Sequence, residues 1–259
     1  MKINIVGAQV DRYSFDEVVE MTIDRALTGT SPAYIVTPNA QHINNLQHDS
    51  LFQEIYRRAF LVVPDGTSIL WAAKFLKTPL KGKVSGSNLF EKLCERGASQ
   101  PLRIFLLGGR PQAAERAAKI LEQRYVGLEI VGTYCPPYGF ENDPSAMKLI
   151  NKEITRAAPN LLFVGLGSPK QEKWVYANYQ QLKVPVSIGI GISFEFIAGM
   201  VKRAPVWMQN SGLEWLFRLM MEPKRLWRRY VIGNPLFIYL VLRQKLGLAK
   251  KFKYQSRNY

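Results

Sequence analysis

The sequence contains few of the residues that build disulfide frameworks and metal centres. Its 259 residues include two cysteines, Cys94 and Cys135, which lie far apart and outside any CxxC pattern. The two histidines, His42 and His48, are too few and too poorly spaced for a metal site. The sequence therefore predicts neither a disulfide framework nor a thiolate metal site, and it suits a reducing compartment.

Long apolar runs are also absent. The longest candidate, PLFIYLVL (235–242), has about a third to a half of the roughly 20 residues that a membrane-spanning helix needs. The opening MKINIVGAQVD lacks the apolar length and the cleavage site of a signal peptide. We expect a protein that stays on one side of a membrane, in the cytoplasm.

Three motifs that hold nucleotides or metal ions are missing. The chain contains neither GxGxxG nor GxxxxGK[ST], which argues against a classical dinucleotide site or a P-loop. It also lacks a DxD motif, and its nearest imitation, Glu141-Asn142-Asp143, reads as a surface turn because PPYGF precedes it and Pro144 follows. We therefore expect no bound metal and no cofactor.

The composition is that of an ordinary globular protein, but the charge is unevenly distributed. The chain is 47% hydrophobic and 21% charged, with a net charge of +15. Residues 202–259 hold 13 Lys or Arg against Glu214 and Glu222, a balance of +11, whereas residues 1–201 carry only +4. A polyanionic partner for the C-terminal segment is predicted, which leaves nucleic acid, an anionic membrane surface and a diphosphate substrate open.

Short apolar runs alternate with helical patterns through the first 199 residues. The strand-like runs are AYIVTPNA, FLVVPDG, PLRIFLLGG, LEIVGTY, PNLLFVGLGS and PVSIGIGIS. Almost continuously apolar strands separated by amphipathic helices indicate βαβ units around a sheet that is covered on both faces. The predicted fold is α/β, a Rossmann-like layered fold with a mainly parallel sheet.

The turns that follow these strands are polar or glycine-rich, and ligands bind at this edge of a parallel sheet. They read TPNAQ, PDGTS, GGRPQ, GSPKQE and GISFE. Thr37, Asn39, Gln41, Asp65 and Gln171 together exceed what connecting loops ordinarily need. Asp65 by itself is ambiguous, because an aspartate there could cap the next helix or act as a base at the mouth of a cleft.

Two glycines, Gly108 and Gly109, lie between a strand and a helix N-terminus, where backbone amides favour anions. This turn is a weak indication of a phosphate site.

Near Gly199 the alternation ends. Leu213, Leu216, Phe217 and Met220 occur at i, i+3, i+4 and i+7, which is one apolar helical face. Prolines at 223 and 235 are expected to divide the segment into separate helices. Aromatic residues beside many arginines are typical of interfacial helices. The sequence therefore predicts a core over residues 1–199 and a basic, amphipathic, membrane-associating helical appendage over residues 200–259.

Eight blocks occur in one order along nearly the whole chain: TPNAQ, PDG, KVSGSNL, LLGG, GTYCPPYGF, GLGSPKQEKW, SFEFIAGMVKRAPVWMQ and GLEWLFRLMMEPKRLWRRYVIGNP. In this order they resemble the WecG/TagA/CpsF glycosyltransferases. The resemblance implies a bacterial inverting enzyme that moves a sugar such as N-acetylmannosamine from a UDP donor. The implied acceptor is a polyprenyl-diphosphate-linked sugar, and the implied location is peripheral, on the inner face of the cell membrane.

The resemblance also implies residue roles. Asp65 of the PDG turn would be the catalytic base, with Thr37 and Gln171 beside it. Arg218, Arg225 and Arg228 would bind the UDP diphosphate. The resemblance also places Glu195 near the nucleotide, and Asn39, Gly108, Gly109 and Gly167 of the turns after the strands are the other candidate UDP-site residues. Two positions depart from the family pattern, since Asn88 and Glu195 stand where aspartate is common. Glutamate has one more methylene group than aspartate, which could alter the contact with the donor. Glu195 is therefore a weaker candidate for a site residue than Asp65.

Arginine can replace a metal ion at a diphosphate because its guanidinium group binds phosphate bidentately and stays charged. We therefore expect a metal-independent transfer. UDP-glucose and an N-acetylmannosaminuronic acid donor stay open as alternatives. A nucleic-acid-binding protein that uses the basic tail is the rival from another class, although we expect no nucleic-acid partner, and a nicotinamide dehydrogenase is a third interpretation. An exposed apolar appendage could also produce a homo-oligomer.

Overall fold

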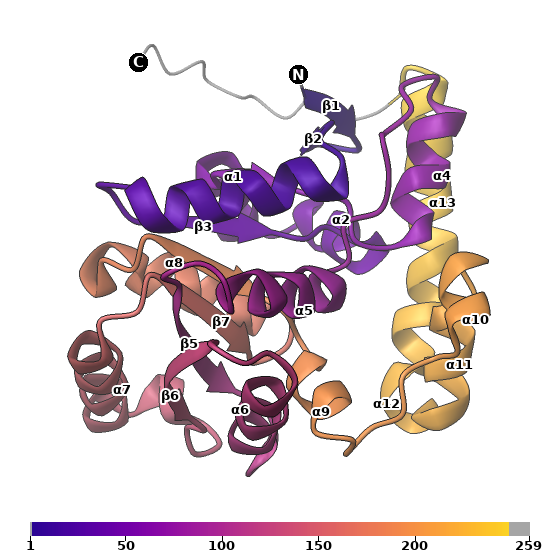
Figure 1. Ribbon diagram of the computed structural model, residues 1–259. Helices are drawn as coiled ribbons and strands as arrows, with labels where there is room; N and C mark the ends of the chain where they lie inside the picture. Colours follow the sequence, from indigo (N-terminus) through magenta and orange to yellow (C-terminus); the bar gives the residue numbers. More distant parts are fainter. Residues whose placement is uncertain (1, 249–259) are drawn as a thin grey trace.

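A computed structural model describes residues 2–248. Its centre is a six-stranded sheet of order β4-β3-β8-β7-β5-β6 in which every neighbouring pair is parallel (Figure 1). The strands are β3 (Ala33–Val36), β4 (Leu61–Val62), β5 (Arg103–Gly108), β6 (Glu129–Tyr134), β7 (Leu161–Gly165) and β8 (Val186–Gly189). They fall in the six runs that the sequence predicts, so the α/β prediction is confirmed.

Helices cover both faces of this sheet because alternate strand residues point in opposite directions. In β5, Phe105 and Leu107 belong to one apolar core, while Ile104 and Leu106 belong to the other. The first face is covered by α2 (Ala40–Leu46), α3 (Ser50–Arg58), α7 (Pro144–Ala157) and α8 (Lys170–Leu182). The second is covered by α1 (Phe15–Thr28), α5 (Gly86–Gly97), α6 (Ala113–Arg124) and α9 (Ser193–Ile197).

The N-terminal segment forms a separate antiparallel hairpin of β1 (Lys2–Ile5) and β2 (Ala8–Asp11). Its two-residue turn holds Val6 and Gly7 at positive φ values of 46° and 94°, which matches the tight turns that join twisted strands. The hairpin is tied to the main sheet by the carboxylate of Asp11, which accepts a hydrogen bond from the Val62 amide at 2.9 Å.

The C-terminal segment contains helices and no strand as far as residue 248. These are α10 (Val206–Asn210), α11 (Glu214–Met221), α12 (Pro223–Trp227), a π-helical turn η2 (Arg228–Ile232) and α13 (Gly233–Lys245). They stand on one side of the core, with α13 running alongside α4 (Thr67–Phe75) (Figure 1). The last part of the predicted appendage, residues 249–259, lies outside the described residues.

One prediction for this segment is wrong. Pro235 does not divide the segment, because it is the third residue of α13 and the chain is helical from α12 onward. The π-helical turn just before it, whose hydrogen bonds span five residues, accommodates a residue that has no N–H group. Pro223 does begin a helix, as expected.

Helix α13 is held at both ends by the core. At its start the Asn44 amide donates to the carbonyl of Gly233 at 2.8 Å. Near its end the Gln244 amide donates to the carbonyl of Asn4 at 2.8 Å. Between these points Phe237 and Val241 are buried in the core beneath α13. Within residues 2–248 no helix is long and apolar enough to cross a membrane.

Candidate active site

A cavity of about 1210 Å³ opens at the carboxyl edge of the sheet. The turns after β3, β4, β5, β7 and β8 form its floor, and α11, η2 and α13 supply its outer wall. All five polar turns singled out in the sequence contribute residues to its lining. Parallel strands bring these turns together because all their carboxyl ends lie at one edge.

Nine of the eleven predicted site residues line this cavity: Thr37, Asn39, Asp65, Gly109, Gly167, Gln171, Glu195, Arg218 and Arg225. Gly108 and Arg228 lie outside the lining. Gly108 is packed against the end of β7, where a Cβ atom would come within 2.8 Å of the Gly165 carbonyl oxygen.

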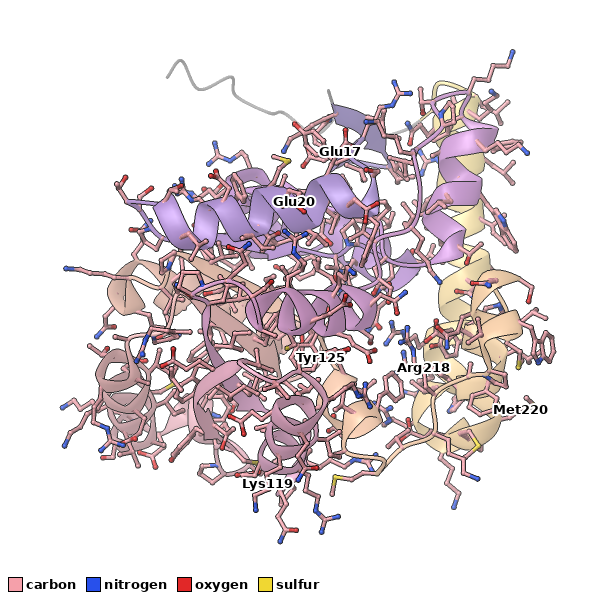
Figure 2. All side chains as sticks on the ribbon, in the orientation of Figure 1. Glu17, Glu20, Lys119, Tyr125, Arg218 and Met220 are labelled. Atoms are coloured by element: carbon pink, nitrogen blue, oxygen red, sulfur yellow. The ribbon has the colours of Figure 1, made fainter. Side chains whose placement is uncertain are left out.

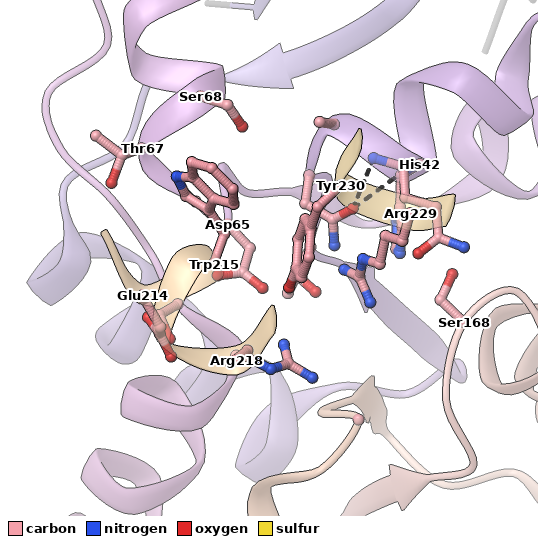
Figure 3. Close-up of a pocket in the computed structure, with 18 of the residues that line it drawn as sticks. His42, Asp65, Thr67, Ser68, Ser168, Glu214, Trp215, Arg218, Arg229 and Tyr230 are labelled. Carbon is pink, nitrogen blue, oxygen red and sulfur yellow. Dashed lines mark hydrogen bonds between the residues drawn. The ribbon is translucent and has the colours of Figure 1, made fainter. Parts of the chain in front are cut away.

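Asp65 follows β4 but does not cap the next helix. The N-cap of α4 is Gly66, at φ +104°, and this helix start has no side-chain capping bond. Of the two roles that the sequence leaves open for Asp65, the helix cap is therefore excluded. The backbone amide of Asp65 is bound to the Pro38 carbonyl at 2.8 Å, which joins its turn to the one after β3. The side chain is left to face the cavity (Figure 3).

The surroundings of Asp65 favour its protonated form. Burial raises the pKa of Asp65 to about 6, and the negative charge of Glu214 acts in the same direction. Lys83, Arg229 and Arg218 oppose these effects. Figure 3 shows Asp65 with Glu214 on one side and the guanidinium groups of Arg218 and Arg229 on the other. A carboxyl group with a pKa near neutrality is suited to general base catalysis.

Arginines reach the cavity from the C-terminal helices. Arg218 of α11 projects toward the core, whereas Met220 on the same helix points away from it (Figure 2). Arg225 and Arg229 also line the cavity. Arg229 is half-buried, and burial lowers the pKa of its guanidinium group.

Arg228 is exposed and stacks outside the cavity, 5.4 Å from the ring centroid of Trp227. Its neighbour Arg229 lines the cavity together with Arg225, because residues four apart on a helix lie on the same face. The sequence shows two adjacent arginines, and nothing in it reveals which of them faces the core.

Gln171 has a fixed orientation. Its amide nitrogen donates to a carboxylate oxygen of Glu172 at 2.7 Å, and its amide oxygen accepts from the Gly191 backbone at 3.0 Å. The same Glu172 oxygen lies 3.8 Å from the imidazole Nε2 of buried His42, whose Nδ1 is 2.7 Å from the Tyr56 hydroxyl. A buried network therefore fixes the Gln171 amide at the wall of the cavity.

Glu195 reaches the floor of the cavity from α9. One carboxylate oxygen accepts from the Arg110 backbone amide at 2.9 Å. The other is buried and has no hydrogen-bond partner among residues 2–248, so it can accept a bond from a ligand. Asn39, in contrast, uses its side-chain oxygen to cap α2, accepting from the backbone amides of Gln41 at 3.0 Å and His42 at 3.3 Å.

The core and the C-terminal helices are also joined across the cavity by an ion pair. The Arg110 guanidinium, from the turn after β5, contacts the carboxylate of Glu222 at 3.0 Å, and Arg225 pairs with the same carboxylate.

Four residues of the site were not predicted from the sequence. They are Arg110, Arg229, Glu214 and Trp215. For Glu214 and Trp215 the sequence gives one signal. Both lie one helical turn before Arg218 in GLEWLFR, which places them beside it on a helix.

The side chains that could bind a metal ion do not form a cluster in the described part of the chain. Residues 2–248 contain no group of three or more His, Cys, Asp or Glu that could hold an ion. The positive charge of the cavity comes instead from Lys83, from Arg110 and from the arginines of the C-terminal helices.

A carboxylate at the edge of a parallel sheet, faced by arginines across one cavity, fits a transferase that acts on an anionic substrate. The comparison with protein families specifies the class. The chain belongs to the glycosyl transferase WecG/TagA/CpsF family, whose model matches residues 3–251. It is therefore a glycosyltransferase.

Curated relatives cover almost the whole chain. The chain is 30% identical over 250 residues to the N-acetylglucosaminyldiphosphoundecaprenol N-acetyl-β-D-mannosaminyltransferase of Staphylococcus aureus strain MW2, a match of 96% of this chain and 95% of the relative. It is 29% identical, with the same coverage, to the protein of that name from strain NCTC 8325 / PS 47.

Proposed function

We propose that this glycosyltransferase moves N-acetylmannosamine, or a closely related sugar, from a UDP donor to a polyprenyl-diphosphate-linked N-acetylglucosamine. It does so with inversion and without a metal ion. The observation that carries the proposal is the carboxylate of Asp65. It caps no helix, its pKa is raised to about 6, and it faces Arg218 and Arg229 across the cavity. The names of the relatives support the sugar and the acceptor.

In this mechanism Asp65 removes the proton of the acceptor hydroxyl while that oxygen attacks the anomeric carbon of the donor. The C–O bond to UDP breaks on the opposite side of the sugar, so the configuration inverts. A well-placed base contributes about 10²–10⁴-fold to the rate.

The departing UDP carries negative charge that develops as the bond breaks. Arg218, Arg225 and Arg229 supply the compensating charge in place of a metal ion. Arg229 takes the role that the family resemblance gives to Arg228, because Arg229 is the one that lines the cavity.

The remaining lining residues position the two substrates. The fixed amide of Gln171 and the hydroxyl of buried Thr37 lie at the same edge as Asp65 and suit the sugar and acceptor hydroxyls. The unpartnered oxygen of Glu195 suits a hydroxyl of the donor. Gly109 and Gly167, both at positive φ, allow the backbone to approach the diphosphate closely.

We also propose that the core ends near residue 199 and that the appendage from residue 200 meets an anionic membrane on its cytoplasmic side. The appendage exposes large apolar side chains beside its basic residues. These include Val206, Trp207, Met220, Met221 and Trp227. Since the inward arginines belong to the appendage, membrane contact and completion of the site would be coupled.

The test is UDP release in EDTA with a polyprenyl-diphosphate-linked N-acetylglucosamine acceptor. The donors are UDP-N-acetylmannosamine, UDP-glucose and UDP-N-acetylmannosaminuronic acid. One donor should be turned over, and the product should have the anomeric configuration opposite to that of the donor. Asp65→Asn should lower kcat by about 10²–10⁴-fold. The exposed Asp24→Asn on α1 is the matched control and should keep its activity. An active Asp65→Asn variant, or activity that requires an added divalent ion, would contradict the mechanism.

A further inference from the structure

The cavity extends beyond the charged groups into an apolar groove between α4 and α13. Helix α4 lines it with Thr67 and Ser68 in its first turn, then with Trp71 and Phe75. The rise of an α-helix places Trp71 about one turn, and Phe75 about two turns, beyond the end that adjoins Asp65. Because Trp71 and Phe75 are four residues apart, they lie on the same face of α4.

Helix α13 shows the same change of polarity along its length. Asn234, in its first turn, lines the cavity near the arginines, and Ile238, Val241 and Leu242 follow. The two helices overlap in the view of Figure 1, and both line the same cavity. Their far ends are joined by Lys245, which donates to the Phe75 carbonyl at 3.0 Å and lies 5.5 Å from its ring centroid.

The groove has a buried floor and exposed walls. Ala72 and Val241 are each 5% exposed and close the bottom. On the walls Trp71 is 60% exposed, Phe75 48% and Ile238 56%. Aromatic and aliphatic side chains left open to water inside a cavity, and continuous with a charged site, mark a ligand site for an amphipathic molecule.

We propose that this groove binds the first isoprene units of the lipid acceptor, with the diphosphate and sugar directed toward Asp65. The inference rests on the proposed function, because it assigns the apolar part of the same acceptor. A nucleotide sugar has no apolar segment that would match Trp71, Phe75 and Ile238. An isoprenoid diphosphate sugar has its polar and apolar parts in the order that α4 and α13 present them.

The experiment measures binding without turnover. Titration calorimetry compares geranylgeranyl diphosphate, below its aggregation concentration, with inorganic diphosphate on the full chain. The wild type should bind the isoprenoid at least tenfold more tightly, because its chain removes apolar surface from water. Trp71→Gln and Ile238→Gln should each weaken this preference, and together they should abolish it. Tyr239→Gln, on the same helix at a residue 53% exposed and outside the cavity lining, should leave it unchanged.

Equal affinity for the two ligands, or a preference that survives in the double variant, would overturn the proposal.

A bilayer is the alternative occupant of the groove. Flotation with phosphatidylglycerol–phosphatidylcholine vesicles that lack isoprenoids tests it. If the double variant loses vesicle binding but keeps its preference for the isoprenoid, the groove residues contact the bilayer and not the acceptor. Since no donor is present, these results are independent of the transfer assay. A protein that binds the isoprenoid but transfers no sugar would refute only the proposed function.

Discussion

Replacing Asp65 with asparagine should stabilise the protein at neutral pH while it removes the proposed base. The pKa of Asp65 is about 6 in the folded chain, against an ordinary value of 3.8. Between these values the folded protein binds a proton that the unfolded chain does not. The free energy of unfolding therefore falls as pH rises from about 4 to about 6, and the full cost of ionised Asp65 is present above that range.

The size of the effect follows from the same two values. At 1.36 kcal/mol for each pH unit, the difference corresponds to an upper limit of about 3 kcal/mol. Asparagine stays polar and leaves Arg218 and Arg229 without a counter-charge, so a gain of about 1–3 kcal/mol at pH 8 is expected. For a chain of this size each kcal/mol shifts Tm by about 2–4 °C. At pH 4 the two proteins should melt together.

Thermal unfolding of wild type and Asp65→Asn at pH 4 and pH 8 tests this reasoning. Ser14→Ala is the reference for a lost helix cap, because Ser14 caps α1 and its hydroxyl accepts from the Glu17 amide at 3.3 Å. That variant should lose about 1 kcal/mol at both pH values. If Asp65→Asn behaves like Ser14→Ala, the carboxylate is structural and the assignment of the base is refuted.

Three further results are expected. Glu214→Gln should move the acid limb of the kcat/KM profile to lower pH, because it removes a negative charge that raises the pKa of Asp65; an unmoved limb would leave burial as the whole cause. Arg229→Lys should lower kcat about tenfold or more while Arg228→Lys changes it less than twofold, and the reverse order would restore Arg228 to the site. Binding to phosphatidylglycerol vesicles should weaken as salt rises from 0.05 to about 0.5 M, and salt-independent binding would argue against electrostatic attachment.

The fold was readable from local patterns because burial on both faces leaves a strong signal. Continuous apolar runs such as LLFVG in β7 can be satisfied only in a covered parallel sheet, and all six such runs became strands. Helix boundaries were less readable. The long pattern after β3 divides into α2 and α3 because Asp49 caps the second helix, accepting from the Phe52 amide at 2.9 Å.

The candidate site was partly readable for a related reason. Thr37 and Asp65 lie in the turns after β3 and β4, and Gln171 lies in the first turn of α8, just after the turn that follows β7. A parallel sheet gathers all such positions at one edge whatever the details of packing. The sequence by itself therefore determined the sheet, its ligand-binding edge and the basic character of the C-terminal segment.

Only the tertiary structure decided what faces that edge. The packing of the C-terminal helices places Arg229 in the cavity and Arg228 outside it, and the docking of α11 brings Glu214 near enough to raise the pKa of Asp65. The apolar groove needs α4 and α13 side by side, although Trp71 and Ile238 lie far apart in the chain. These features depend on the rotation and packing of helices, which composition and spacing do not encode.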